Sequence, residues 1–155
     1  MVKGGEGRKR RMAKHLIDTD VYIDFLQSGQ FRAEIARIYA EHTPGIYFSS
    51  VVVEELLAGA ISPAERKSVE TLYLPFERAG RVVTPTHANW KETGDVLARI
   101  FREQPSSRSK LPQIVSDCLI ALSARTIGAT VYTRNRADFE LVQQFHRFTL
   151  DVLLN

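Results

Sequence analysis

Carboxylates follow the first apolar segment of this chain. The stretch HLIDTDVYIDF, residues 15–25, places Asp18 and Asp20 directly after a short apolar run, and Asp24 follows one helical turn later. Two carboxylates about 4 Å apart repel by roughly 4 kcal/mol at an effective dielectric constant near 20. A chain that gathers such groups at the end of a buried strand therefore needs something to offset their repulsion.

A second pair of acidic residues lies in the segment SSVVVEELLAGA, residues 49–60. Adjacent helical residues point about 100° apart, so at most one of Glu54 and Glu55 is well placed to face a site. Glu55 lies at the edge of the packed face formed with Val51 and Val52, and we expect Glu54 to be solvated. From this segment alone, a charge on the helix surface is the alternative interpretation of both residues.

Asp117 lies in QIVSDCLIALSARTIGA, where nearly every residue is apolar or small, which predicts a helix buried on most sides. Its own face continues with the small residues Ala121, Ala124 and Gly128. Buried aspartates are rare unless they are paired or bound to a metal, because burying an unpaired ion costs several kcal/mol. The alternative is a structural aspartate held in the first turns of the helix.

The last acidic residue of interest follows the fourth apolar segment, in VYTRNRADF. Asn135 is able to cap a helix, and Asp138 would then lie in its first turn, where the helix dipole favours a negative charge without any catalysis. Taken alone, Asp138 is interpreted as a helix-cap charge. Taken with the earlier residues, it completes a set of four: Asp18, Glu55, Asp117 and Asp138.

The type of these side chains indicates a class of metal. No histidine or cysteine accompanies them at ligand spacing, which argues against zinc. An all-oxygen cluster is typical of Mg²⁺ or Mn²⁺, and such an ion would offset the repulsion among the carboxylates. A metal held in this way can activate water and stabilise the charge of a phosphoryl group.

The elements that must position these residues alternate between strand and helix, which predicts an α/β sandwich with a largely parallel sheet. Ser62 and Glu65 form a capping box that begins a helix, and in the following helix Trp90, Gly94, Leu97 and Phe101 share one face. Functional groups collect at the carboxyl ends of parallel strands. Short strands are predicted at residues 15–18, 46–48, 81–83 and 130–132, with a weaker one near 146–150.

Composition predicts one soluble domain of residues 15–155 behind a basic leader of residues 1–14. The leader has a net charge of +5 and the remainder −2, within a total of +3. No apolar run approaches the roughly 20 residues of a membrane span, and no apolar signal-peptide core follows the N-terminal charges. With a single cysteine, Cys118, we expect a cytoplasmic protein without an intramolecular disulfide.

Four pieces of the chain, LIDTDVYIDFL, SSVVVEELLAGA, VSDCLIALSA and VYTRNRADF, together resemble the PIN-domain ribonucleases, and specifically the VapC-type toxins of bacterial toxin–antitoxin pairs. The resemblance spans almost the whole domain, from Leu16 onward. It implies a PIN-like three-layer α/β sandwich, in which a mostly parallel central sheet of about five strands carries helices on both faces.

The resemblance also implies roles for individual residues. Asp18, Glu55, Asp117 and Asp138 would correspond to the acidic set that binds Mg²⁺ or Mn²⁺, and Glu55 rather than Glu54 fits the family pattern Glu-Leu-x-x-Gly. Asp20 departs from the asparagine that is more usual in the family, and its role is left open. The supporting polar positions implied after the fourth strand are Thr133 and Asn135, of which Asn135 could share the final metal-site role with Asp138.

Similar proteins cleave RNA endonucleolytically with Mg²⁺ or Mn²⁺, and they are often homodimers held inactive by a cognate antitoxin. By this resemblance a metal-bound water attacks the phosphodiester bond and no covalent intermediate forms. The candidate RNA contacts are Arg108 and Lys110, in the loop PSSRSKLP (residues 105–112), and Arg134 and Arg136, which flank the last motif. A solvated loop is the alternative for the first two.

Two rival functions fit parts of the sequence. A haloacid-dehalogenase-like phosphatase would use Asp18 as nucleophile and Asp20 as its acid–base partner. Against it, no glycine-threonine follows that pair and no lysine lies at a later strand end. The second rival is a non-catalytic PIN-like binding module; a degenerate site of that kind would be expected to lose some of the four acidic residues, and all four are present.

Overall fold

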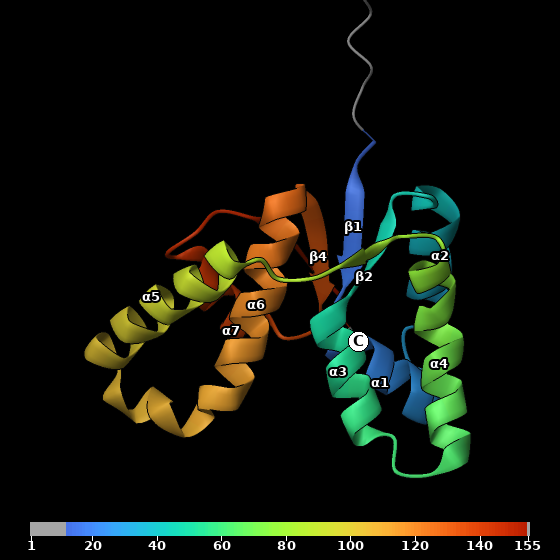
Figure 1. Cartoon of the computed structure of the whole chain (residues 1–155), viewed down its shortest axis with the longest axis horizontal. Helices are drawn as coiled ribbons and strands as arrows, with labels where there is room; N and C mark the ends of the chain where they lie inside the picture. The colour runs from blue at the N-terminus through green and yellow to red at the C-terminus, as the bar shows by residue number, and fades with distance from the viewer. Residues whose placement is uncertain (1–11, 155) are drawn as a thin grey trace, which may run out of the picture.

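The computed structural model describes residues 12–154, which form one five-stranded sheet with helices on both faces (Figure 1). The strands are β1 (Lys14–Ile17), β2 (Ile46–Ser49), β3 (Val82–Val83), β4 (Ala129–Thr133) and β5 (Thr149–Val152). The helices are α1 (Thr19–Ser28), α2 (Arg32–His42), α3 (Ser50–Gly59), α4 (Pro63–Arg78), α5 (His87–Glu103), the 3₁₀ helix η1 (Pro105–Lys110), α6 (Leu111–Ile127) and α7 (Arg136–Gln143). Most of the predicted leader lies outside the described residues, but β1 already begins at Lys14.

The sheet has the strand order β3-β2-β1-β4-β5, and every neighbouring pair is parallel. The predicted α/β class with about five strands is therefore confirmed, although the last strand begins at Thr149 rather than near residue 146. Because the strands are parallel, their carboxyl ends all lie along one edge of the sheet, the lower edge in Figure 1. Each connection between them carries at least one helix, as parallel strands require.

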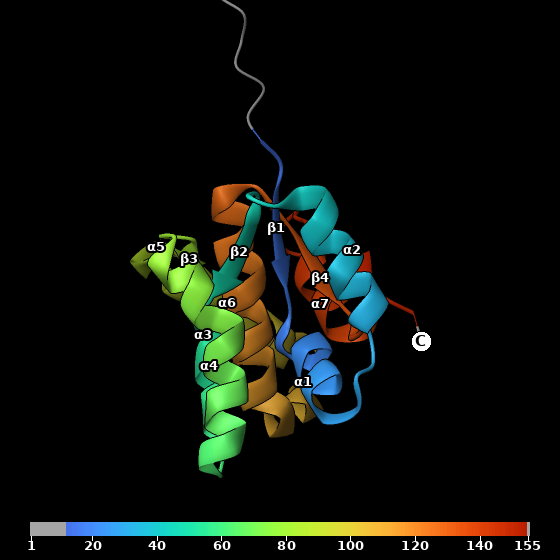
Figure 2. The ribbon, with the colours of Figure 1, turned by 90° about the vertical axis from the view of Figure 1, so that its right-hand side faces the viewer.

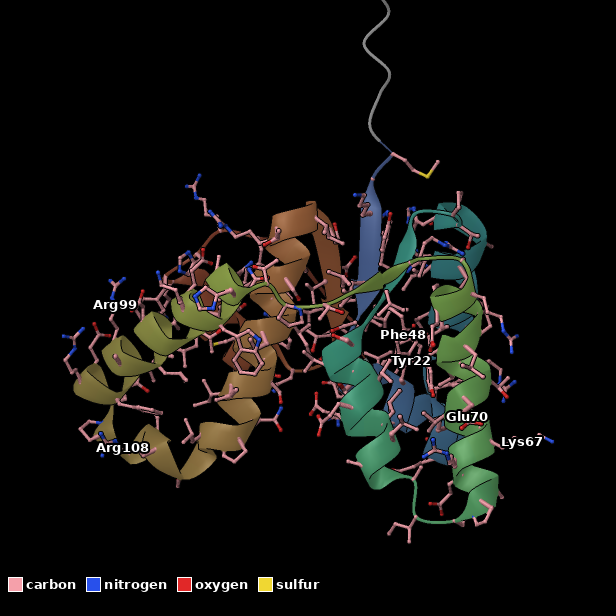
Figure 3. The ribbon with its side chains drawn as sticks, in the orientation of Figure 1. Tyr22, Phe48, Lys67, Glu70, Arg99 and Arg108 are labelled. Carbon is pink, nitrogen blue, oxygen red and sulfur yellow. The ribbon has the colours of Figure 1, made fainter. Side chains whose placement is uncertain are left out.

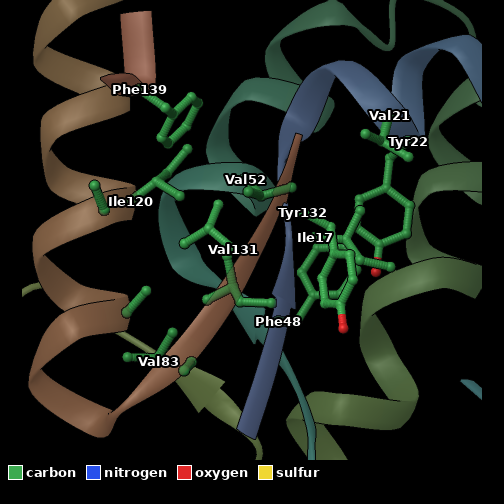
Figure 4. Packing of buried hydrophobic residues seen from close by; sticks show 14 of the residues in the cluster. Ile17, Val21, Tyr22, Phe48, Val52, Val83, Ile120, Val131, Tyr132 and Phe139 are labelled. Atoms are coloured by element: carbon green, nitrogen blue, oxygen red, sulfur yellow. The ribbon is translucent and has the colours of Figure 1, made fainter. Parts of the chain in front are cut away.

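Both faces of the sheet are buried. On one side Val131 faces Ile120 and Phe139 of α6 and α7, and on the other Phe48 packs against Tyr22 of α1 (Figure 4). The rings of Tyr22 and Phe48 are stacked with their centroids 4.9 Å apart. Strands that are buried on both faces read as continuous apolar runs in the sequence, which explains why the short central strands were predictable.

The predicted capping box at the start of α4 is present. The Ser62 hydroxyl oxygen accepts a hydrogen bond from the Glu65 backbone N–H at 3.1 Å, and the Glu65 carboxylate accepts from the Ser62 N–H at 3.4 Å. Such a reciprocal pair satisfies two of the backbone donors that a helix leaves unpaired at its N-terminus. The helix begins at Pro63, as the proline after the cap predicts.

The face of α5 that carries Trp90, Gly94, Leu97 and Phe101 is only partly buried. Trp90 is 55% exposed and Gly94 is also exposed, and only Leu97 and Phe101 of the predicted face pack against the core. The helix instead buries a polar–apolar row about 100° away: Asn89, Thr93, Val96 and Ile100. The reason is that Asn89 donates hydrogen bonds to the Leu122 carbonyl and the Thr126 hydroxyl of α6, at 3.3 and 2.9 Å.

No helix within residues 12–154 is long and apolar enough to cross a membrane.

The ring of Phe48 lies in the centre of the core, 1% exposed. We expect Phe48→Ala to lower the free energy of unfolding by about 3–5 kcal/mol, because truncation removes buried apolar area and leaves a cavity. Urea denaturation of both proteins measures the change, provided that the free energy of unfolding falls with urea concentration at the same slope in the two. Ile61→Ala is the matched control: Ile61 is 92% exposed, so its effect is expected within about 0.5 kcal/mol. Equal losses for the two variants would contradict this description of the core.

Candidate functional site

Three strands end at the carboxyl edge of the sheet and turn directly into helices. Asp18 follows β1 and caps α1, where its Oδ1 accepts a hydrogen bond from the Thr19 N–H at 2.8 Å. Ser49 ends β2 and caps α3, and Asn135 follows β4 and caps α7. Figure 2 shows β1 leading straight into α1. These short connections leave the acidic residues little freedom to lie elsewhere.

The carboxylate of Asp18 is oriented by a hydrogen bond from the last residue of β4, Thr133. The Thr133 hydroxyl donates a hydrogen bond to Asp18 Oδ2 at 2.8 Å and lies 3.4 Å from Asp20 Oδ2. Thr133 in turn accepts from the Asn135 N–H at 2.9 Å. Asp18 is only 3% exposed, and the Oδ1 atom of Asp20 is buried without a hydrogen-bond partner among the described residues. The ends of β1 and β4 are therefore joined through two buried or half-buried carboxylates.

Helix α3 presents one of its two neighbouring glutamates to the site. The Thr19 hydroxyl donates to Glu55 Oε1 at 2.9 Å, whereas Glu54 is exposed. On α6, Asp117 is 2% exposed and accepts from the amide nitrogen of Gln113, which lies 3.2 and 3.4 Å from its two oxygens. Each of these carboxylates therefore has one neutral donor that orients it.

Asp138 lies in the first turn of α7, as its position after Asn135 predicts. The Asn135 amide donates to Asp138 Oδ2 at 2.7 Å, and Asn135 Oδ1 lies 3.5 Å from the Asp138 backbone nitrogen. Asp138 is half-buried. Asn135 thus serves the helix cap and orients the carboxylate at the same time.

The carboxylates influence one another. The pKa of Asp117 is raised to about 8, and burial is the largest cause. The hydrogen bond from Gln113 lowers the pKa, whereas the negative charges of Asp138, Glu55 and Asp20 raise it further. The pKa of Asp18 is also well above its usual range, because of burial first and then the charges of Asp20 and Asp117. All five acids are thus linked by mutual repulsion, with Asp117 at the centre.

Burial likewise raises the pKa of Glu55, and the charges of Glu54 and Asp20 add to it. The hydrogen bond from Thr19 acts in the opposite direction. The site therefore favours a positive charge or protons near these groups.

A cavity of about 520 Å³ opens beside these groups. Asp117 and Asp138 do not line it themselves, but Gln113 and Asn135, to which they are hydrogen-bonded, do. The lining residues are Asp18, Thr19, Asp20, Ile23, Glu55, Gln113, Arg134, Asn135, Arg136 and Ala137. The cavity is thus lined by three acids, Asp18, Asp20 and Glu55, and by two arginines.

The donor set fits a hard divalent cation by its chemistry. All of the converging groups offer oxygen, their charges repel, and Asp20 has a buried oxygen without a partner. Among residues 12–154, however, no three histidine, cysteine, aspartate or glutamate side chains are arranged so that they could hold a metal ion as they stand. Coordination would therefore require these carboxylates to rearrange.

Two of the four predicted RNA-contacting cations lie at the cavity. Arg134 and Arg136 line it, whereas Arg108 and Lys110 are exposed on η1 and do not. The segment predicted as a loop forms this 3₁₀ helix, where the Arg108 guanidinium lies 5.7 Å from the centre of the Phe101 ring. Figure 3 shows Arg108 at the outer end of the α5–η1 lobe, away from the sheet.

Two of the residues that orient the acids were not predicted from the sequence. Thr19 lies within the LIDTD segment, and Gln113 lies four residues before Asp117, the spacing at which helical side chains meet. That spacing could have indicated Gln113. The ion pair between Asp24 and Arg134, 2.6 Å from Arg134 Nε to Asp24 Oδ2, was not predicted from the sequence.

The raised pKa of Asp117 makes stability depend on pH. Between about pH 4, where an unfolded aspartate titrates, and about 8, the folded chain holds a proton that the unfolded chain has lost, so the free energy of unfolding falls as pH rises. Asp117→Asn removes this dependence. We expect its advantage over wild type to grow with pH and to reach about 2–4 kcal/mol near pH 8 in metal-free buffer.

Urea denaturation from pH 5 to 9 with EDTA measures this difference. Asp95→Asn, at an exposed position on α5, is the control and should give only a small difference in the free energy of unfolding. A wild type that is more stable than Asp117→Asn at pH 8 would contradict the mutual repulsion of the acids.

Comparison with known proteins places the chain in a family. The model of the PIN domain matches residues 15–143. A chain of DNA-bound VapBC from Salmonella typhimurium is similar in structure, with a TM-score of 0.65 and 21% identity over 91% of this chain and 98% of that one. FitAcB from Neisseria gonorrhoeae gives a TM-score of 0.62 and 19% identity, over 87% of this chain and 94% of that one.

VapBC2 from Rickettsia felis, bound to a promoter DNA fragment, gives a TM-score of 0.61 at 16% identity, over 90% of this chain and 98% of that one. At these identities the likeness establishes the fold alone. No curated protein matches the sequence. The family model, by contrast, covers the sheet from β1 to β4 and every acidic residue of the site, and on that match the chain belongs to the PIN domain family.

Proposed function

We propose that this chain is an endoribonuclease that cleaves RNA phosphodiester bonds with Mg²⁺ or Mn²⁺. PIN domains are nuclease-type hydrolases, which gives the reaction class. The observation that carries the metal dependence is the convergence of acids from β1, α1, α3, α6 and α7 beside one cavity, where burial and mutual repulsion raise the pKa of Asp18, Glu55 and Asp117. The choice of RNA rests on the resemblance of the sequence motifs.

Asp18, Asp117, Glu55 and Asp138 would hold the ion, with Asp20 as an additional oxygen donor. When bound, the metal supplies a Lewis acid and an activated water for attack on phosphorus. The chain's neutral donors, Thr133, Thr19, Gln113 and Asn135, each fix one carboxylate. Arg134 and Arg136 lie on the cavity wall, where a guanidinium can contact phosphate oxygens.

The phosphatase alternative loses support. Both oxygens of Asp18 accept a hydrogen bond, one from the Thr19 N–H and one from Thr133, and each keeps a lone pair for a metal ion, so the geometry of Asp18 fits a metal ligand. Membership of the PIN domain family also favours the nuclease. The alternative function, a non-catalytic binding module, is tested by the cleavage experiment below.

Defined tRNA and rRNA fragments incubated with purified protein test the activity. We expect cleavage with Mg²⁺ or Mn²⁺ and none with EDTA, and a loss of at least about 100-fold for Asp117→Asn, because a central ligand is removed. Glu54→Gln is the matched control, since Glu54 is exposed beside Glu55, and should cleave within about twofold of wild type. Sequencing of the new ends locates the cleaved bonds.

Cleavage that persists in EDTA, or equal cleavage by wild type and Asp117→Asn, would contradict the proposal. Absence of cleavage by wild type, together with absence of Mn²⁺ binding, would favour the binding module.

We further propose that the chain is the toxin of a toxin–antitoxin pair and that its antitoxin covers the acidic cavity. The support is the likeness to chains of VapBC and FitAB complexes, together with a groove of about 410 Å³ between α1, α3 and α4. The groove shares Ile23 and Glu55 with the acidic cavity, and Ile61 at its edge is 92% exposed. The homodimer implied by the resemblance is part of this proposal.

Expression in a bacterial host tests the pair. We expect wild type to arrest growth, the cognate antitoxin to relieve the arrest, and Ile61→Glu to keep the arrest but escape relief, since a buried unpaired charge weakens docking in the groove. Lys67→Glu is the control, because Lys67 points outward from α4 (Figure 3) and should be relieved like wild type. Relief of Ile61→Glu to the same degree would place the antitoxin elsewhere, and growth without arrest would argue against a toxin.

A further inference from the structure

The two arginines on the cavity wall are each paired with an acid that does not line the cavity. Arg134 Nε lies 2.6 Å from Asp24 Oδ2, and Arg136 Nε lies 3.8 Å from Glu140 Oε1. The first pair is the closer and the less exposed: the side chain of Asp24 is 18% exposed and that of Arg134 is 46% exposed. Asp24 stands on α1 one turn after Asp20, so it can reach the connection between β4 and α7.

Without such a pairing, Arg134 would have other anions within the same cavity. Asp18, Asp20 and Glu55 line it, and Asp20 Oδ1 is buried without a hydrogen-bond partner among the described residues. A guanidinium is always charged and can donate two parallel hydrogen bonds to one carboxylate. An arginine that turned onto these acids would compete directly with a divalent cation for their oxygens.

We propose that Asp24 is a positioning residue that holds the Arg134 guanidinium at the rim of the cavity. Held there, Arg134 leaves the carboxylates available to the metal and stays in place to contact a phosphate of the bound RNA. This inference rests on the proposed metal-dependent nuclease activity. It assigns Asp24 a role that acts through Arg134 rather than through contact with the reacting atoms.

A merely structural role predicts something different. If the pair only ties α1 to the β4–α7 connection, its loss lowers stability slightly, as for other partly exposed ion pairs, and leaves metal affinity unchanged. If Asp24 acts only by its long-range negative charge, Asp24→Asn weakens metal binding equally whether or not Arg134 is present. A double-mutant cycle separates these cases from the proposal.

The experiment measures Mn²⁺ dissociation constants by calorimetry for the full chain and for Asp24→Asn, Arg134→Gln and the double variant. We expect Asp24→Asn to weaken Mn²⁺ binding about 10-fold, as loss of a residue supporting a metal site does, and to change it less than about twofold once Arg134 is glutamine. Glu70→Gln is the charge-matched control: it breaks the Arg66–Glu70 pair of 2.9 Å on α4 and should leave Mn²⁺ affinity unchanged.

An equal effect of Asp24→Asn in both backgrounds, or no effect in either, overturns the positioning role while leaving the proposed nuclease intact. Failure of wild type to bind Mn²⁺ overturns the proposed function and this inference with it. RNA cleavage adds a second readout: Arg134→Gln should raise KM more than it lowers kcat, since a phosphate contact at the rim contributes to substrate binding.

Discussion

Repulsion among carboxylates is the constraint around which this fold is arranged. Asp117 lies at its centre: buried on α6, it feels the charges of Asp138, Glu55 and Asp20, and its pKa rises to about 8. Each acid is held by a neutral donor from a neighbouring residue or element, so the groups are oriented without being neutralised. The packing of the buried sheet and its two layers of helices must offset the free-energy cost of gathering these carboxylates. Such a balance between an active site and the core that carries it is common.

The fold was predictable where burial dictates the residue type. Strands buried on both faces are short apolar runs, and the capping box at Ser62 marks the start of α4 through local hydrogen bonds alone. The buried row of α5 was not predicted because the residue that begins it, Asn89, is polar. Asn89 is buried against α6 through hydrogen bonds to Leu122 and Thr126, and no pattern of hydrophobic residues reveals such a contact.

The convergence of the acids was predictable for a similar reason, because a charge directly beside an apolar run, as at Asp18 and Asp117, is easily recognised in the sequence. The residues that orient those charged groups are not recognisable from the sequence. Thr19 and Gln113 are neutral and common on helices, and the partner of Arg134 is 110 positions away in the sequence, at Asp24. The local charge of the sequence also did not predict which cations line the cavity. Arg108 and Lys110 lie on η1 outside it, although their sequence neighbourhood is as basic as that of Arg134.

The strand order has a consequence for how the protein is made. The first strand of the chain is the central one, and its partner on one side, β4, begins at Ala129. During synthesis β1 can pair with β2 early, but Asp18 must wait for Thr133, and the acidic set gains Asp117 and Asp138 only after β1, β2 and β3 have been made. Contacts so distant along the chain also form slowly. For a chain proposed to cut RNA, this order of assembly leaves the site incomplete on the ribosome until α6, β4 and α7 have been made.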